Sequence, residues 1–254
     1  MTVLHTDLDN TLIYSYRHDI GNNKINVEIY QGREISFLTE NTYDNLKKIK
    51  EKALIVPTST RSIEQYNRIN LRIGSIPYAL VCNGGVLLTD GEMEPSWYQA
   101  SLELIRESLP ALDRARRFLE RDARRKFELR FIEELFLFTK CREPESVVTE
   151  LKEITDTDVA DIFHNKEKVY VVPRSLSKGN AIERFREYIK ADRVIAAGDS
   201  EFDIPMLQAA DTGIAPGGFR QEYSIDFQVE EMPGKGLFSD EMTEKVLELC
   251  RCGL

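Results

Sequence analysis

Short apolar runs alternate with amphipathic stretches at both ends of the chain. Each apolar run is followed by a polar cluster, a pattern that is typical of buried parallel strands joined by helices. Strands are expected at 3–6, 53–56, 78–82, 194–197 and 212–215, and helices at 43–51, 178–189 and 204–209. These segments predict one α/β domain built from both ends of the chain, with right-handed crossovers between its parallel strands.

The pattern changes between about residues 87 and 172. Two long helical stretches, two β-rich runs, a third helix and two more strands follow one another there. This order predicts a small α+β domain with an antiparallel sheet. We therefore expect a core domain made of residues 1–86 and 173–254, into which a second domain, residues 87–172, is inserted.

Several local signals predict turns and helix ends. Two β-rich runs at 25–30 and 35–38 predict a hairpin with a four-residue turn. Ser62, with Gln65 three residues later, is typical of a capping box. Asn41 and Ser239 are the expected caps of the helices that follow them, and 227–229 is expected to be a short terminal strand.

Composition and charge narrow the class of protein. Hydrophobic residues make up 42% of the 254 residues and charged residues 30%, which is ordinary for a soluble globular protein. The net charge of −9 counts against a general nucleic-acid binder. No run approaches the ~18 apolar residues of a membrane span, and Asp7 and Asp9 interrupt any signal-peptide core.

The cysteines indicate a reducing compartment. Four of them are too few and too scattered for a disulfide framework: Cys82, Cys141, Cys250 and Cys252. We expect a cytoplasmic protein that is a monomer or a weak dimer, without nucleic-acid or membrane partners.

Two carboxylates follow the first expected strand. Asp7 and Asp9 lie at its end, with Thr11 two residues further on. Close carboxylates suit a hard cation such as Mg²⁺, and they also suit a nucleophile paired with a general acid/base. The alternative is a strand end followed by an ordinary turn that Asp and Thr cap.

A second acidic cluster follows the expected strand at 194–197. Asp199 and Asp203 are four residues apart at the start of a helix, where acidic residues also interact favourably with the helix dipole. The carboxyl ends of parallel strands meet at one edge of the sheet, so this pair and the pair at Asp7 and Asp9 are expected to lie close together. A divalent cation is the simplest way to offset four carboxylates there.

Two further clusters lie at expected helix starts. Lys178 opens the helix at 178–189, where a lysine is mildly unfavourable to the helix dipole. It is either a solvated surface lysine or a group that holds an anion against the carboxylates. Thr58, Ser59, Thr60 and Arg61 offer hydroxyls and backbone amides that suit a phosphate, although a hydroxyl there is often only a helix cap.

These four pieces, in this order, resemble the motifs of the haloacid dehalogenase superfamily of phosphatases. The stretch from Asp7 to Thr11 is similar to the DxDxT motif, and Ser59, Lys178 and the pair Asp199 and Asp203 resemble the second, third and fourth motifs. Val81 to Gly85 is similar to the strand and "NG" turn of the Cof-type branch. The position of the insertion resembles the branch with a C2 cap, which includes sucrose-phosphate phosphatase and the phosphomannomutases.

The resemblance implies a Rossmann-like parallel-sheet core with an inserted α+β C2 cap, and a Mg²⁺-dependent phosphatase acting on a small phosphorylated metabolite, with a sugar phosphate favoured. It implies that Asp7 attacks phosphorus and that Asp9 is the general acid/base. Phosphate-binding groups would be Thr11, Ser59, Thr60 and Lys178. Metal ligands would be the Asp7 carboxylate, the Asp9 carbonyl and Asp199, with Asp203 in support.

The chain also departs from the family pattern. Phe202 stands where an Asn is usual in the fourth motif, and Thr60 where a Gly is usual in the second. Three other functions stay open: a sugar phosphomutase of the same superfamily, a non-catalytic binding or regulatory protein, and a nucleic-acid end phosphatase, which the arginines of the inserted domain suggest. Arginines between 114 and 125 of the inserted domain either contact an anionic ligand or form a solvated helix face with i,i+4 ion pairs.

Overall fold

The structure, a computed structural model, describes residues 1–251 and divides them into two compact units. One unit combines Met1–Met93 with the chain from Lys178 onward, and the other is Glu94–Ser177. Cys252 lies outside the described residues.

A five-stranded parallel sheet forms the centre of the first unit. Its strand order is β15-β14-β13-β1-β5. These strands are β1 (Thr2–Thr6), β5 (Leu54–Pro57), β13 (Arg193–Ala197), β14 (Thr212–Ala215) and β15 (Glu230–Glu231). Thr6 pairs with Ala197 on one side and with Pro57 on the other. The loops that follow β1, β5 and β13 therefore leave the same edge of the sheet, as the sequence predicts.

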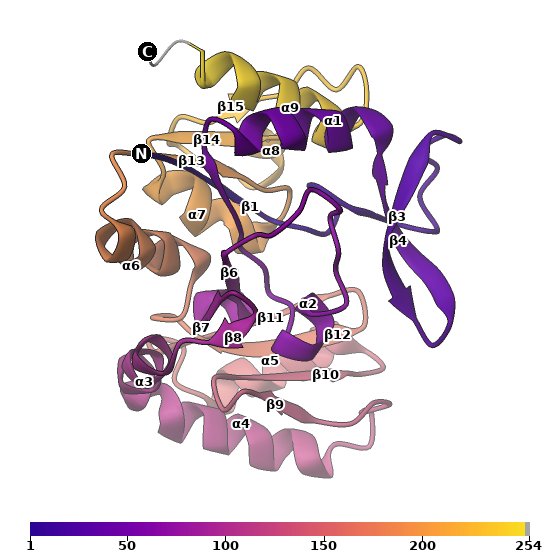
Figure 1. Cartoon of the computed structure of the whole chain (residues 1–254). Helices are drawn as coiled ribbons and strands as arrows, with labels where there is room; N and C mark the ends of the chain where they lie inside the picture. The colour runs from indigo at the N-terminus through magenta and orange to yellow at the C-terminus, as the bar shows by residue number, and fades with distance from the viewer. Residues whose placement is uncertain (252–254) are drawn as a thin grey trace. The chain divides into compact units, whose positions relative to one another are not determined.

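Helices cover both faces of this sheet (Figure 1). On one face α1 (Glu40–Lys50) and α9 (Phe238–Leu249) lie side by side, and their apolar residues share one core with strand residues such as Leu4 and Ile195. On the other face lie α6 (Lys178–Ile189) and α7 (Ile204–Ala209). Alternate side chains of a strand face opposite sides, so each strand contributes apolar residues to both layers.

Two smaller antiparallel sheets complete the first unit. One has the order β2-β4-β3, from β2 (Tyr14–Ser15), β3 (Lys24–Tyr30) and β4 (Arg33–Thr39). The other has the order β6-β7-β8, from β6 (Tyr78–Val81), β7 (Val86–Thr89) and β8 (Glu92–Met93). Short helical turns are α2 (Ile63–Tyr66), α8 (Phe219–Glu222), η1 (Cys82–Gly84) and η3 (Glu201–Asp203).

The second unit is an α+β fold. Its antiparallel sheet has the order β11-β12-β10-β9. Apolar side chains of α4 and α5, including Leu112, Leu119 and Leu151, form a core with Leu137 and Val171 of this sheet. The elements are α3 (Pro95–Leu104), η2 (Arg106–Ser108), α4 (Leu109–Arg121), β9 (Arg130–Ile132), β10 (Phe136–Lys140), α5 (Pro144–Ile154), β11 (Ala160–Asn165) and β12 (Lys168–Pro173).

The mixed architecture confirms the predicted α/β class, but three local predictions are wrong. Thr39, not Asn41, caps α1, because its hydroxyl accepts a hydrogen bond from the Thr42 amide at 2.9 Å. Ser239 lies inside α9, where its hydroxyl accepts from Thr42 at 2.8 Å. The last strand is Glu230–Glu231, so 227–229 is not part of the sheet.

The predicted hairpin is confirmed with a shorter turn. Its strands extend to Tyr30 and resume at Arg33, leaving only Gln31 and Gly32 between them. Both turn residues have positive φ, 50° and 74°, which suits the twist of a two-residue hairpin. Within residues 1–251, no helix is both long and apolar enough to cross a membrane.

Candidate functional site

Asp7 lies immediately after β1, at the edge where the loops of the parallel sheet meet. Its backbone amide donates to the Ala197 carbonyl at 2.9 Å, which continues the pairing of β1 with β13 by one residue. The residue is 7% exposed. Burial raises the pKa of Asp7 well above its usual range, and the charge of Lys178 opposes that rise.

Lys178 is buried between two carboxylates, so its interpretation as a solvated surface lysine is wrong. Its Nζ lies 2.6 Å from Asp7 Oδ1 and 2.5 Å from Asp203 Oδ1, and its side chain is 1% exposed. Burial lowers the pKa of Lys178, but the negative charges of Asp203 and Asp7 outweigh it and raise the pKa above its usual range. The lysine is therefore a fixed positive charge.

Glycine at two positions allows α6, α7 and the loop after β13 to pack closely around Lys178 and Asp203. A Cβ on Gly179 would lie 2.5 Å from the Pro205 carbonyl oxygen of α7, so a side chain there would push α6 away. A Cβ on Gly198 would lie 2.3 Å from the Asp203 Cβ. The tight packing of α6, α7 and the loop after β13 thus depends on residues that have no side chain.

Asp203 braces that loop. Its Oδ2 accepts hydrogen bonds from the Asp199 amide at 3.1 Å, the Ser200 amide at 2.9 Å and the Ser200 hydroxyl at 2.8 Å. Its other oxygen accepts from Lys178. Asp203 is fully buried, and it holds Asp199 and Lys178 in place with both carboxylate oxygens.

Asp199 completes what we call the acidic cluster, Asp7, Asp199 and Asp203. Each of the three offers a carboxylate oxygen, and these oxygens lie within 4.8 Å of one another. The Thr11 hydroxyl donates to Asp199 Oδ1 at 2.8 Å. Burial and the charge of Asp203 raise the pKa of Asp199 to about 7, against the opposing hydrogen bond from Thr11.

The acidic cluster fits a divalent cation. Hard oxygen ligands at this spacing are what Mg²⁺ prefers, and a cation there would oppose the burial and the mutual repulsion that raise the pKa of Asp7 and Asp199. Asp7 and Asp199 are the better candidates for direct ligands, because both oxygens of Asp203 are already hydrogen-bonded.

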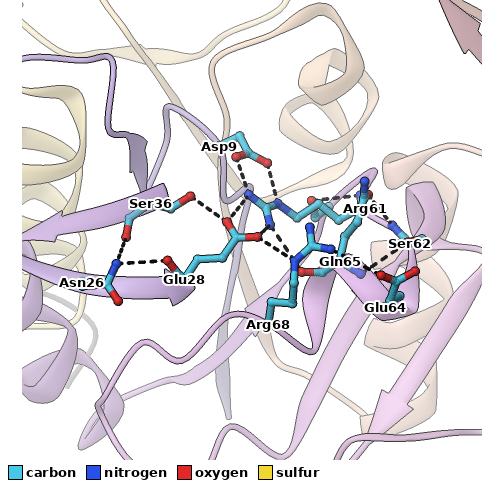
Figure 2. A network of polar contacts seen from close by, with 10 residues as sticks. Asp9, Asn26, Glu28, Ser36, Arg61, Ser62, Glu64, Gln65 and Arg68 are labelled. Carbon is cyan, nitrogen blue, oxygen red and sulfur yellow. Dashed lines mark hydrogen bonds and ion pairs between the residues drawn. The ribbon is translucent and has the colours of Figure 1, made fainter. Parts of the chain in front are cut away.

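Asp9 lies in a different environment from Asp7. Arg61 donates from Nε to Asp9 Oδ2 at 2.7 Å and from Nη2 to Asp9 Oδ1 at 2.8 Å. The same guanidinium contacts buried Glu28 of β3 (Figure 2). The Asp9 side chain is 53% exposed, so it combines a fixed guanidinium partner with access to solvent.

The predicted hydroxyls after β5 differ in what they face. Thr58 is buried, and its hydroxyl donates to the Val56 carbonyl at 3.2 Å and contacts His5 Nδ1 at 2.9 Å. Burial lowers the pKa of His5 to about 3, so this imidazole is neutral. Ser59 is also buried, and its hydroxyl accepts from the Arg61 amide at 3.2 Å. Thr60 is partly exposed.

A strained turn lies beside Ser59. Cys82, Asn83 and Gly84 all have positive φ, which costs free energy for the first two. The Asn83 amide donates to the Ser59 carbonyl at 3.0 Å, and the Cys82 amide to the Arg61 carbonyl at 2.8 Å. The "NG" turn therefore holds the backbone of the Ser59 loop.

The structure brings most of the predicted site residues to one sheet edge, but it gives some of them unexpected partners. The Thr11 hydroxyl donates its only hydrogen to Asp199, so a phosphate-binding role for Thr11 remains a prediction. Sequence reasoning missed Glu28, because an isolated glutamate in a β-rich run carries no signal.

Comparisons with known proteins indicate a family and a fold. Residues 111–222 match the family model for haloacid dehalogenase-like hydrolases. No curated protein matches the chain.

Solved structures at low identity show the same fold. The sucrose-phosphatase of Synechocystis sp. PCC6803, solved with sucrose and phosphate, has a TM-score of 0.65 at 15% identity, over 97% of this chain and 96% of that chain. A phosphatase of the haloalkanoate enzyme superfamily from Bacteroides thetaiotaomicron has a TM-score of 0.58 at 18% identity, over 99% and 95%.

A more distant enzyme is similar over part of its length. The IMP-nucleotidase of Plasmodium falciparum, N-terminally truncated and bound to IMP, has a TM-score of 0.59 at 12% identity, over 98% of this chain and 68% of that chain. Residues 111–222 therefore resemble the haloacid dehalogenase-like hydrolases, and the solved structures share the fold of the chain.

Proposed function

We propose that the chain is a Mg²⁺-dependent phosphomonoesterase that acts on a small phosphorylated metabolite through an aspartyl-phosphate on Asp7. One observation carries the proposal. The buried Asp7 carboxylate lies 2.6 Å from the buried Lys178 ammonium, and a second candidate metal ligand, Asp199, belongs to the same acidic cluster. This gives a nucleophile with a fixed positive charge at its side.

The proposed reaction has two halves, which use both aspartates. An Asp7 oxygen attacks phosphorus while the bond from phosphorus to the leaving oxygen breaks, and Asp9 gives that oxygen a proton. In the second half, Asp9 takes a proton from water, whose oxygen attacks phosphorus and releases phosphate from Asp7. The exposure of Asp9 supports its exchange of protons with solvent.

Catalysis of phosphoryl transfer depends mainly on alignment and on positive charge that stabilises the phosphoryl oxygens. The remaining groups are assigned these two roles. Lys178 offsets the negative charge that Asp7 and the phosphoryl oxygens bring together. Ser59 and Thr60 are the candidate phosphate contacts in the loop after β5. Asp7, Asp199 and the Asp9 carbonyl would hold Mg²⁺, which supplies further positive charge to the phosphoryl group.

The likeness to the sucrose-phosphatase structure, solved with sucrose and phosphate, supports a sugar phosphate as the first substrate to test. The second compact unit, Glu94–Ser177, is the candidate cap that would select the substrate and exclude water. Fold likeness alone leaves the substrate open, so the assay needs several classes of compound.

The test is phosphate release from a panel of sugar phosphates, nucleoside monophosphates and aryl phosphates, with Mg²⁺ and with EDTA. We expect release from at least one class with Mg²⁺, loss in EDTA, and loss in the Asp7→Asn variant. An isomerised sugar phosphate with little free phosphate would identify a mutase instead. Release that persists in Asp7→Asn would contradict the assignment of the nucleophile.

A further inference from the structure

We propose that Glu28 is a positioning residue for the reaction: it holds Arg61 in the conformation that orients the Asp9 carboxylate. The inference rests on the proposed function, because it assigns Asp9 the role of general acid/base. It adds a role for the hairpin of β3 and β4, which lies outside the four motif-bearing loops.

The Arg61 guanidinium has every N–H group engaged (Figure 2). Nε and one hydrogen of Nη2 donate to the two oxygens of Asp9 at 2.7 and 2.8 Å. Nη1 and the other hydrogen of Nη2 donate to the two oxygens of Glu28 at 3.0 and 3.1 Å. The fifth hydrogen reaches the Gln65 carbonyl at 3.4 Å. With five donors committed, Arg61 serves Asp9 rather than a substrate phosphate.

The Glu28 carboxylate also has all of its hydrogen-bonding positions occupied. Its Oε1 accepts from Arg61 at 3.0 Å and from Arg68 Nε at 3.0 Å, and its Oε2 accepts from Arg61 at 3.1 Å and from the Ser36 hydroxyl at 2.6 Å. Four bonds fill the four lone-pair sites of a carboxylate. Asp9, Glu28, Arg61 and Arg68 together carry no net charge, and Arg68 also pairs with the exposed Glu64 at 3.6 Å. The Glu28 side chain is 1% exposed.

These hydrogen bonds fix the charge on Glu28. Burial by itself raises the pKa of a carboxyl, but the hydrogen bonds from Arg61 and Ser36 outweigh it and lower the pKa of Glu28. Arg61 thus lies between two carboxylates, one buried and one exposed. The buried partner determines where the guanidinium is held.

An irregularity in the hairpin directs Glu28 inward. The pairing of β3 with β4 shifts register on both sides of Glu28, which lies opposite Ser36. Val27 and Glu28 are consecutive and both buried, whereas a regular strand turns successive side chains to opposite faces. Asn26 braces the irregularity, because its side-chain amide donates to the Glu28 and Ser36 carbonyls at 3.0 and 3.1 Å. Such irregularities re-aim side chains near active sites.

The consequence for the reaction is orientation. A half-exposed aspartate without a fixed partner distributes over several rotamers, and only some of them present an oxygen to the leaving group. Arg61 holds both oxygens of Asp9, and Glu28 holds Arg61. Removing the Glu28 charge therefore impairs proton delivery more than nucleophilic attack by Asp7.

The test compares two substrates that differ in their need for that proton. The leaving group of phenyl phosphate is a stronger base than that of p-nitrophenyl phosphate, so its departure depends more on a general acid. The value kcat/KM reports only the steps up to the release of the phenol, which excludes the later attack by water. We would measure it for both compounds in wild type, Glu28→Gln, Glu28→Asp and a matched control, Glu34→Gln, an exposed glutamate of the same hairpin.

We expect Glu28→Gln to lower kcat/KM for phenyl phosphate by about tenfold more than for p-nitrophenyl phosphate, Glu28→Asp to recover part of this selectivity, and Glu34→Gln to match wild type. An equal fall on both substrates, or no fall, would overturn the proposal. If Glu28→Gln does not fold, Ser36→Ala is judged by the same criterion, because it removes one hydrogen bond from Glu28.

Repeating the measurement in the Asp9→Asn variant tests whether Glu28 acts through Asp9. If Glu28 acts through Asp9, adding Glu28→Gln to Asp9→Asn leaves the ratio of the two kcat/KM values unchanged. A further change in that ratio would mean that Glu28 acts by another route. Wild-type protein that hydrolyses neither these compounds nor any other member of the panel would count against the proposed function, whereas hydrolysis without selectivity in Glu28→Gln counts against the role of Glu28 alone.

Discussion

Asp7 and Asp9 are two residues apart in the sequence, yet the fold gives them opposite surroundings. Asp7 is buried among carboxylates and contacts the ammonium of Lys178, whereas Asp9 is half-exposed and contacts the guanidinium of Arg61. Two carboxylates in distinct environments can perform distinct tasks. The buried one suits attack on phosphorus, and the exposed one suits proton transfer to and from solvent.

The two basic partners are also held differently. Lys178 belongs to the parallel-sheet core, where Gly179 lets α6 pack closely on α7. Arg61 depends on Glu28, which the hairpin supplies. The candidate nucleophile is thus positioned by the parallel-sheet core, whereas the orientation of the proposed acid/base depends on the hairpin of β3 and β4.

The largest effects on activity are expected when Asp7 and Asp9 are each replaced, because the two aspartates are assigned separate tasks. Asp7→Asn should lower kcat by about 10⁴-fold or more on every substrate, because it removes the nucleophile. Asp9→Asn should lower kcat/KM by about 10²–10⁴-fold on phenyl phosphate and by less on p-nitrophenyl phosphate. Steady-state kinetics on both variants checks this, and equal effects of Asp9→Asn on the two substrates would contradict the assigned role.

Removing Lys178 tests the buried side of the comparison. Lys178→Met leaves Asp7 and Asp203 without their counter-charge, so we expect a loss of about 3 kcal/mol in the free energy of unfolding at pH 8. The loss should be smaller at pH 5, because the raised pKa of Asp7 favours its neutral form as the pH falls. Urea unfolding at both pH values measures it, and an equal loss at pH 5 and pH 8 would argue against the charge explanation.

Removing the Glu28 charge tests the hairpin side. Glu28→Gln leaves Arg61 and Arg68 without a buried anion, so the free energy of unfolding should fall by about 2–4 kcal/mol. Glu34→Gln, the exposed control, should change it by less than about 0.5 kcal/mol. Matching values for the two variants in urea unfolding would contradict the buried network.

The acidic cluster should make the stability of the protein depend on pH and on metal, each in a direction that can be predicted. Without metal, the pKa of Asp199 rises from 3.8 to about 7 on folding. The fold therefore favours its protonated form, and the stability from this group is complete below about pH 4 and is lost as the pH rises through about 7. In EDTA, Tm should be lower at pH 8 than at pH 5, and Asp199→Asn should weaken this trend.

Mg²⁺ should then stabilise the protein at pH 8. At a concentration ten times its Kd, a cation that binds only the folded state adds about 1.4 kcal/mol to the free energy of unfolding. Thermal melting with and without Mg²⁺ measures the gain. A gain of the same size in Asp199→Asn would place the cation elsewhere.

The sequence was most informative where strong periodic patterns coincide with short connections. The helices 178–189 and 204–209 and the strand 212–215 were predicted with the bounds that the structure has, because apolar spacing and flanking polar residues agree there. The capping box of Ser62 and Gln65 was likewise predicted and is present. These signals are local, so they can be read without knowing the fold.

Other features depend on tertiary contacts that no local pattern records. Asn41 has the composition of a cap, but Thr39 is the residue that also contacts Asp240 of α9, so tertiary contacts favour it. The burial of Lys178 depends on Asp7 and Asp203, which lie far away in sequence. Glu28 reaches Arg61 only because the hairpin departs from regular pairing.

The most direct test of the central claim, that Asp7 and Asp9 have separate tasks, is chemical trapping of the intermediate. Borohydride reduces an aspartyl-phosphate to homoserine, which mass spectrometry locates within the peptide that contains both aspartates. During turnover of a hydrolysed aryl phosphate, we expect homoserine at position 7 and unchanged aspartate at position 9. Homoserine at position 9, or none at either position while phosphate is released, would contradict it.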